Sequence, residues 1–217
     1  MRKLTLLFSS ISVFILVSSF SDDNSGKWIL QKSENGIVVY TRTLQGSSIK
    51  EVRVVNKVRS SFSGMVALLF DTRNYTNWIY ACTESHSIKV VSPQEIYNYQ
   101  VTDFPWPVSD RDLICNFKVS QDSATKIVSF IKTGMPEYLP EKTPYVRIRD
   151  FQSKYRLIPS LRDSITVELE MRVDPGGDIP TWLINSNIVM APYKSTIAML
   201  SHVPKYQSAS YSFIREK

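Results

Sequence analysis

The most constraining feature of this sequence is the segment 163–173, in which polar and apolar side chains alternate. Because successive side chains of a β-strand point to opposite faces, this pattern predicts a strand with one face on a core and the other in water. Strands of this kind are typical of antiparallel sheets. The apolar face consists of Ile165, Val167, Leu169, Met171 and Val173.

Further segments read as strands, and they follow one another through short connections, which favours antiparallel pairing. A change to helical spacing predicts a helical insert over 62–80. The predicted strands are 37–43, 50–58, 86–92, 95–102, 111–120, 125–132 and 145–158.

A strong turn signal, DPGG at 174–177, ends this run of strands. We expect a long amphipathic helix to start near Asp178, with Pro180 in its first turn and a kink or local opening at Pro192. One helix across a twisted sheet is an α+β arrangement, and a pocket can remain beneath it. The apolar stripe of the helix comprises Ile179, Trp182, Leu183, Met190, Tyr193, Ile197 and Leu200.

The N-terminal residues 1–21 have the pattern of a secretory signal peptide. Two basic residues precede an apolar run of 14 residues at 4–17, whereas a transmembrane helix needs about 20. We therefore expect residues 22–217 to form a single exported domain, periplasmic in a Gram-negative source and otherwise secreted.

Removal of Arg2 and Lys3 with the signal lowers the formal charge from +6 to +4. This mild surplus gives no indication of nucleic-acid binding. In an oxidising compartment Cys82 and Cys115 either pair in one disulfide or serve as two small buried residues.

Catalytic and cofactor-binding patterns are sparse. The spacing of Cys82 and His86 would suit a nucleophile and a base on a helix, but the helical pattern has faded by Glu84. The sequence contains no metal-ligand spacing and no glycine-rich phosphate loop, so we expect no cofactor and no metal.

The stretch DFPWPVSDRD at 103–112 connects two predicted strands. Its prolines interrupt the sheet, and Trp106 either covers a pocket edge or plugs the core. Arg111 and Asp112 point to opposite faces, so we interpret this stretch as a structural corner in which Arg111 binds Asp103, Asp110 or a backbone carbonyl. The corner residues are Pro105, Trp106, Pro107, Arg111 and Asp112.

Taken together, several segments of the chain resemble the START (lipid-transfer) family over about residues 27–203. The matching segments are Trp28 with YTR at 40–42, NYTNW at 74–78, FPWPVSDRD at 104–112 and DPGGDIPTWLINSNI at 174–188. The resemblance implies a helix-grip fold, in which a curved antiparallel sheet wraps around the C-terminal helix and encloses a hydrophobic tunnel. It also implies a lid formed by that helix and a loop between strands.

Sterol-binding members of the family place an acid and a base on neighbouring cavity strands. The corresponding positions here are Phe117 for the base and Tyr97 or Asn98 for the acid, so that mode of sterol recognition is not expected. The expected ligand contacts are alternate residues of the strands, which share one face of the sheet, together with residues of the helix stripe. They are Tyr97, Tyr99, Leu113, Phe117, Phe130, Leu169, Met171, Trp182, Met190, Tyr193 and Ile197.

We therefore expect a monomeric, non-enzymatic binding or transfer protein for a hydrophobic small molecule or lipid, whether fatty acyl or sterol-like. The alternatives are a cyclase-like helix-grip enzyme and an interaction module whose groove is filled by its own side chains. We expect transient contact with an anionic membrane through a cluster of basic residues. The alternative interpretation is that this cluster is a solvated sheet edge. The cluster comprises Arg147, Arg149, Lys154, Arg156 and Arg162.

Overall fold

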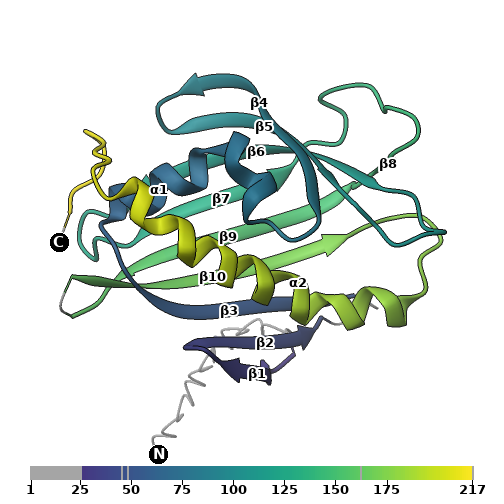
Figure 1. Ribbon diagram of the computed structural model, residues 1–217, viewed down its shortest axis with the longest axis horizontal. Coiled ribbons are helices and arrows are strands. Elements are labelled where there is room, and N and C mark those ends of the chain that lie inside the picture. The colour runs from purple at the N-terminus through teal and green to yellow at the C-terminus, as the bar shows by residue number, and fades with distance from the viewer. Residues whose placement is uncertain (1–25, 45, 48, 162, 217) are drawn as a thin grey trace, which may run out of the picture.

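The computed structural model describes residues 26–44, 46–47, 49–161 and 163–216, so the expected signal peptide lies outside the described residues. The described chain forms one sheet of ten strands, with two α-helices on one of its faces (Figure 1). The strands are β1 (Ile29–Glu34), β2 (Ile37–Thr43), β3 (Lys50–Arg59), β4 (Cys82–Ser92), β5 (Glu95–Thr102), β6 (Arg111–Gln121), β7 (Val128–Gly134), β8 (Val146–Arg147), β9 (Asp150–Pro159) and β10 (Ser164–Asp174).

The spatial order of the strands is β1-β2-β3-β10-β9-β7-β6-β5-β4, and every pair of neighbours on this path is antiparallel, as predicted. The short strand β8 lies off this path and pairs in parallel with β6. Strand β1 was missed because most of its side chains are exposed, so its sequence lacks the alternation that marks a half-buried strand.

The predicted helix 62–80 is correct only in its first half. Helix α1 (Phe62–Phe70) starts at Ser61, whose hydroxyl accepts a hydrogen bond from the N–H of Gly64 at 2.9 Å. After Asp71 the chain tightens into a 3-10 helix, η1 (Thr72–Asn77). The Tyr75 hydroxyl donates to the carbonyl oxygen of Leu69, so η1 folds back onto the end of α1.

The C-terminal helix α2 (Thr181–His202) begins after Pro180 and continues through Pro192 into the 3-10 helix η2 (Val203–Tyr206). It packs against β2 and β3 and crosses the sheet (Figure 1). None of the helices in the described part of the chain is long and apolar enough to cross a membrane.

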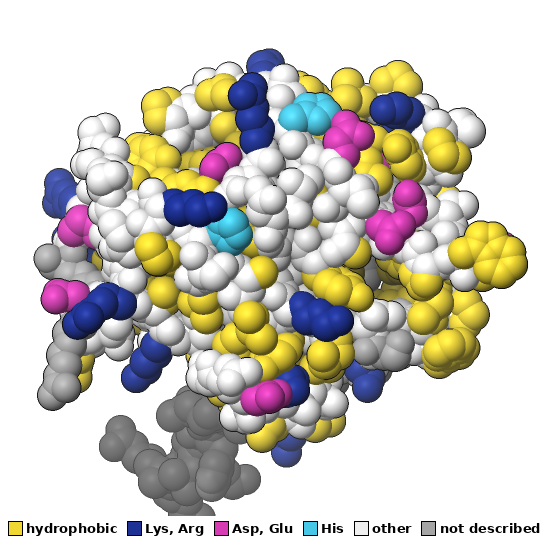
Figure 2. Space-filling model, viewed as in Figure 1, with side chains coloured by type: hydrophobic (Ala, Val, Ile, Leu, Met, Phe, Trp, Pro, Cys, Tyr) yellow, Lys and Arg dark blue, Asp and Glu magenta, His cyan; other side chains and the backbone are white. Residues whose placement is uncertain are grey.

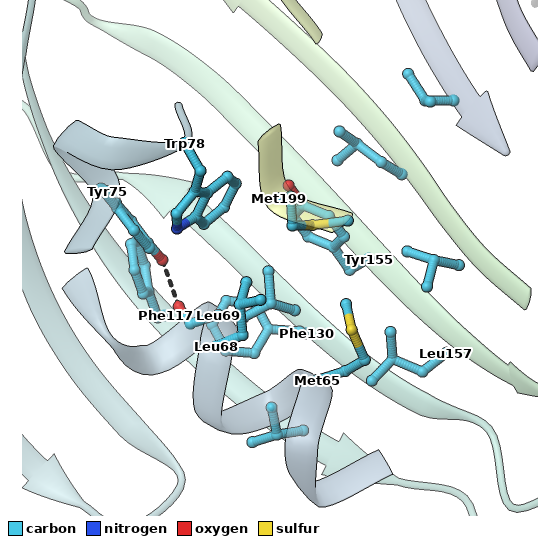
Figure 3. Close-up of a cluster of buried hydrophobic side chains, with 14 of the residues drawn as sticks. Met65, Leu68, Leu69, Tyr75, Trp78, Phe117, Phe130, Tyr155, Leu157 and Met199 are labelled. Atoms are coloured by element: carbon cyan, nitrogen blue, oxygen red, sulfur yellow. Dashed lines mark hydrogen bonds between the residues drawn. The ribbon is translucent and has the colours of Figure 1, made fainter. Parts of the chain in front are cut away.

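The space between sheet and helices is closely packed near α1 (Figure 3). Met65, Leu68 and Leu69 of α1 are fully buried there, together with Met199 from the C-terminal half of α2. The sheet contributes Phe117, Phe130 and Leu157 to this cluster. The core is therefore solid at this end, and any internal space must lie under the N-terminal half of α2.

Candidate functional site

A cavity of about 440 Å³ lies between the N-terminal half of α2 and the sheet. This volume is within the range of ~300–1,000 Å³ that is typical of small-molecule sites. The floor is built by β6, β7, β9 and β10, because alternate residues of these strands point to the helix-covered face. Its residues are Leu113, Cys115, Phe117, Lys132, Phe151, Ser153, Tyr155, Leu169, Met171 and Val173.

The roof of the cavity is the inner face of α2. It is lined by residues 183, 187, 191 and 195 and by residues 184, 188 and 192, two adjacent rows with the i, i+4 spacing of one helix face. Four of the residues that line the cavity are exposed: Tyr80, Asp103, Pro105 and Asn187. The cavity therefore reaches the surface where the β5–β6 corner and the connection before β4 meet the first half of α2.

Only some of the expected ligand contacts line the cavity. Leu113, Phe117, Leu169 and Met171 line the cavity. Phe130 points to the same face of the sheet but lies in the packed core, with its ring centroid 4.9 Å from that of Phe70.

Tyr97 and Tyr99 do not line the cavity. The ring of Tyr97 stacks on Tyr138 at a centroid distance of 4.4 Å, and Tyr99 belongs to a second apolar cluster with Val101 and Ile114. Asn98 is buried, but it donates hydrogen bonds to Ser85 and to the carbonyl oxygen of His86. On β5 the cavity is instead lined by Gln100 and Thr102, because alternate residues of a strand point to opposite faces and the two tyrosines lie on the other one.

The helix stripe also needs correction. Trp182, Met190 and Ile197 are exposed rather than turned to the cavity. Tyr193 is buried, but its hydroxyl accepts a hydrogen bond of 2.9 Å from Asn35, outside the cavity. Of the predicted stripe, Ile179 and Leu183 do line the cavity, but Ile184, Ile188 and Ala191 form the rest of the inner face.

The corner residues make buried structural contacts. The Arg111 guanidinium donates to the carbonyl oxygens of Pro175 at 3.2 Å, Gly176 at 2.9 Å and Ser109. Arg111 thus binds backbone carbonyls, which were one of the partners expected from the sequence. These bonds tie β6 to the DPGG turn. Gly177 has φ +70°, and a Cβ there would lie 3.2 Å from Arg111 Nη2, so the turn requires glycine.

Asp112 and Arg147 form a bidentate ion pair, with distances of 2.8 and 2.9 Å, and both side chains are 1% exposed. Arg147 also donates to the carbonyl oxygens of Pro136, Leu139 and Pro140. The ion pair raises the pKa of Arg147. Arg147 therefore anchors the β7–β8 loop and is unavailable to a membrane.

The rest of the predicted basic cluster is also largely neutralised. Arg149 pairs with Glu137 and Glu141, and Arg156 pairs with Glu168. Lys154 is exposed, and Arg162 lies outside the described residues. Lys154 and Arg156 lie on β9, an inner strand between β10 and β7, so this surface is a solvated sheet face and not the expected sheet edge. Its paired charges give no support to a membrane-docking patch.

Trp106 is 92% exposed, so it does not plug the core, while the neighbouring Pro105 lines the cavity entrance. Pro107 is also exposed and, unlike Pro105, does not line the cavity.

The two cysteines are free and buried. Burial raises the pKa of Cys82 to about 11 and that of Cys115 to about 12, which disfavours the reactive thiolate. Cys82 and His86 both lie on β4 rather than on a helix, and the imidazole of His86 faces Glu84 at 3.4 Å. The structure thus agrees with the sequence analysis, which did not favour a nucleophile–base pair here.

Among the lining residues that the sequence reasoning missed, Lys132 on β7 is the one with a buried charge. Its side chain lines the floor although the residue is only 6% exposed. Its Nζ lies 3.2 Å from the Tyr75 hydroxyl and about 4.5 Å from the ring centroids of both Tyr75 and Phe117. Burial lowers the pKa of Lys132 to about 8. The alternation Val128, Phe130, Lys132 was the available signal for this position.

An open antiparallel sheet that holds a C-terminal helix over an internal, mainly apolar cavity defines a helix-grip protein. Residues 21–194 match the START domain family, and the chain belongs to that family. The fold and family predicted from the sequence are thereby confirmed.

Known proteins resemble the chain over most of its length. The STAR-related lipid transfer protein fragment 25–204 of Xanthomonas axonopodis is 30% identical with a TM-score of 0.76, covering 82% of this chain and 98% of that chain. An uncharacterized protein of Pseudomonas aeruginosa is 30% identical over 178 residues, which are 82% of this chain and 87% of that protein. The phosphatidylcholine transfer protein of Rattus norvegicus is 23% identical over 162 residues, 73% of this chain and 75% of that protein.

Proposed function

We propose that this protein binds a hydrophobic ligand, a lipid or another molecule with a long apolar part, in the cavity under α2 and carries it between membranes. The single observation that carries this proposal is the cavity itself, because an apolar space of about 440 Å³ with few polar groups suits an acyl chain. Each methylene group removed from water contributes about 0.8 kcal/mol, so such a ligand binds without many specific contacts. The relatives named as lipid transfer proteins support the same function.

Loading and release require an opening, and we assign this role to the N-terminal half of α2. Pro192 has no N–H to bond the carbonyl oxygen of Ile188, so the helix is weakened where it covers the cavity. The Tyr80 N–H donates to Ser195 Oγ at 2.9 Å, which holds the helix to the connection before β4. Displacement of the segment before Pro192 exposes the ligand without unfolding the packed half of α2.

The surface around the entrance is suited to a membrane interface. Trp106 at the β5–β6 corner and Trp182 at the start of α2 are 92% and 71% exposed, and their sequence neighbours Pro105 and Leu183 line the cavity. Tryptophan is favoured at the boundary between lipid and water. Figure 2 shows hydrophobic side chains gathered at the edge where Figure 1 places these two segments. We propose that this edge docks on the membrane during exchange.

We further propose that residues 1–21 direct export and that the mature chain acts as a monomeric carrier without catalysing a reaction. The raised thiol pKa values of Cys82 and Cys115 support a binding role, because neither thiol in or near the cavity is activated.

Native mass spectrometry of the mature protein from its own host, followed by organic extraction, tests this function. We expect one lipid to co-purify with wild type. Ala191→Trp, which fills the roof of the cavity, should purify empty, whereas the adjacent outward-facing Met190→Trp is the matched control and should retain the lipid. A wild-type protein that is empty and takes up no sterol, fatty acid or phospholipid from vesicles contradicts the proposal.

A further inference from the structure

Lys132 is a cation buried at the floor of a mainly apolar cavity. Its ammonium group is surrounded by the aromatic rings of Tyr75 and Phe117, with those of Phe130 and Tyr155 about 6 Å away. These rings hold the side chain in place and favour its positive charge. They do not neutralise that charge, since an aromatic ring carries none.

No carboxylate is paired with Lys132 among the residues that the structure describes. The charged or titratable groups around it are Tyr75 from η1, Cys82 from β4, Cys115 from β6 and Tyr155 from β9. Burial raises the pKa of each of these groups, so all of them are neutral at pH 7. A buried charge without a partner is costly, and this one lies at the floor of the proposed ligand cavity.

Lys132 and Trp78 also have hydrogen-bond donors without an acceptor in the described chain. An ammonium group has three donors, and the Tyr75 hydroxyl is the one acceptor that Lys132 reaches within the described chain. Trp78 lines the same cavity and is buried, and its Nε1 has no hydrogen-bond partner in the described part of the protein. Its ring centroid lies 5.0 Å from that of Tyr75, and Figure 3 shows the indole nitrogen on the side that faces Tyr75.

We propose that the ligand is an acidic lipid whose single anionic head, a carboxylate or a phosphate, lies at the floor of the cavity against Lys132, with its apolar tail toward α2. This inference rests on the proposed lipid-binding function and specifies its ligand class. An anionic oxygen group supplies acceptors and no cation, which matches the unpaired ammonium and the indole N–H. The phosphate of a phospholipid and the carboxylate of a fatty acid share this chemistry.

The first test compares palmitate with its neutral analogues hexadecanol and methyl palmitate. Wild type should bind palmitate at least about tenfold more tightly, the size of effect that one charge-assisted hydrogen bond produces. Lys132→Met keeps the length of the side chain and removes its charge, so this preference should disappear while hexadecanol still binds. Lys154→Met removes an exposed lysine from the neighbouring strand β9 and should retain the preference.

The pH dependence provides a second readout. Because the pKa of Lys132 is about 8 in the free protein, the charged form falls about tenfold in population between pH 7 and pH 9, and palmitate affinity should fall by a similar factor. The neighbouring thiols and phenols stay neutral in this range. Hexadecanol binding, and palmitate binding to Lys132→Met, should change little over the same interval.

Phosphatidic acid and phosphatidylcholine then show which kind of lipid supplies the anionic head. Binding of dipalmitoyl phosphatidic acid that depends on Lys132, with no palmitate binding, identifies a phosphate and supports the proposal. Equal affinity for palmitate and hexadecanol, or phosphatidylcholine binding that is unchanged in Lys132→Met, overturns it and leaves the carrier function standing. If wild type binds none of these lipids, the carrier function fails together with the inference.

Discussion

Lys132 and Arg147 are both buried cations on strands of one sheet, yet they differ in every contact that determines the cost of burying a charge. Arg147 forms a bidentate pair with Asp112 and also binds three backbone carbonyls. Lys132 reaches one hydroxyl and several aromatic rings. Accordingly, the ion pair raises the pKa of Arg147, whereas burial lowers that of Lys132.

This difference separates a structural region from a binding region. A buried charge that is paired and fully hydrogen-bonded fixes the segments around it, and breaking its pair is destabilising. A buried charge without a partner is itself destabilising, and a ligand that neutralises it recovers part of that free energy. The β7–β8 loop and corner therefore hold the fold, while the cavity floor is prepared for a ligand.

The largest expected effect is the loss of the Arg147 partner. Asp112→Asn leaves the guanidinium buried without its counter-charge and should lower the free energy of unfolding by about 3–5 kcal/mol. Urea denaturation measures this value from the transition midpoint. A change below about 1 kcal/mol would show that the three carbonyl bonds suffice and that Arg147 and Lys132 are less different than their contacts indicate.

Lys132→Met should have an effect of the opposite sign in the ligand-free protein. The lowering of the lysine pKa from 10.5 to about 8 corresponds to about 3 kcal/mol of stability lost at neutral pH, which methionine restores. Urea denaturation at pH 7 should therefore show a more stable variant. A destabilised Lys132→Met would mean that the aromatic rings compensate the buried charge.

The pH dependence of stability checks the same point in wild type. Between about pH 8 and pH 10.5 the unfolded chain keeps the lysine proton that the folded protein has released, so the ligand-free protein should gain stability as pH rises through this interval. The penalty is fully present below pH 8. Lys132→Met lacks this titration, and the difference in unfolding free energy between the two proteins should shrink toward pH 10.5.

The smallest effect is expected for an exposed ion pair. Glu137 and Arg149 are separated by 2.6 Å, but both side chains are well exposed. Glu137→Gln should therefore change the unfolding free energy by less than about 1 kcal/mol, because solvent screens the pair and mobile side chains lose entropy in forming it. A loss comparable to that of Asp112→Asn would refute the assignment of stability to burial and pairing.

Much of the fold was predictable because alternation and turn chemistry are local. The strands β2 and β5 have the predicted bounds, and the apolar face of β10 was read directly from its sequence. Prediction failed where local signals were weak, as in the exposed β1, or where tertiary contact ended a helix, as when Tyr75 folds back on Leu69.

The site was less predictable, and the reasons are specific. Parity on β6 and β10 correctly placed Leu113, Phe117, Leu169 and Met171 on the cavity face. On α2 the apolar residues are spread too widely around the helix for the sequence to show which stripe docks. Lys132 shares a face with Phe130, but parity does not distinguish a buried lysine from one whose ammonium group reaches the surface.

The sequence by itself determined the antiparallel strands and the turn before the C-terminal helix, because each depends on residues close together along the chain. It also determined the family, because each of the motifs that together mark it is a short continuous segment. Only the tertiary structure decided which face of α2 covers the cavity and which buried charges are paired. Arg147 meets Asp112 across 35 positions, and Lys132 meets Tyr75 across 57. Burial and pairing are properties of such distant contacts, so the difference between a structural arginine and a ligand-binding lysine emerges only when the chain is folded.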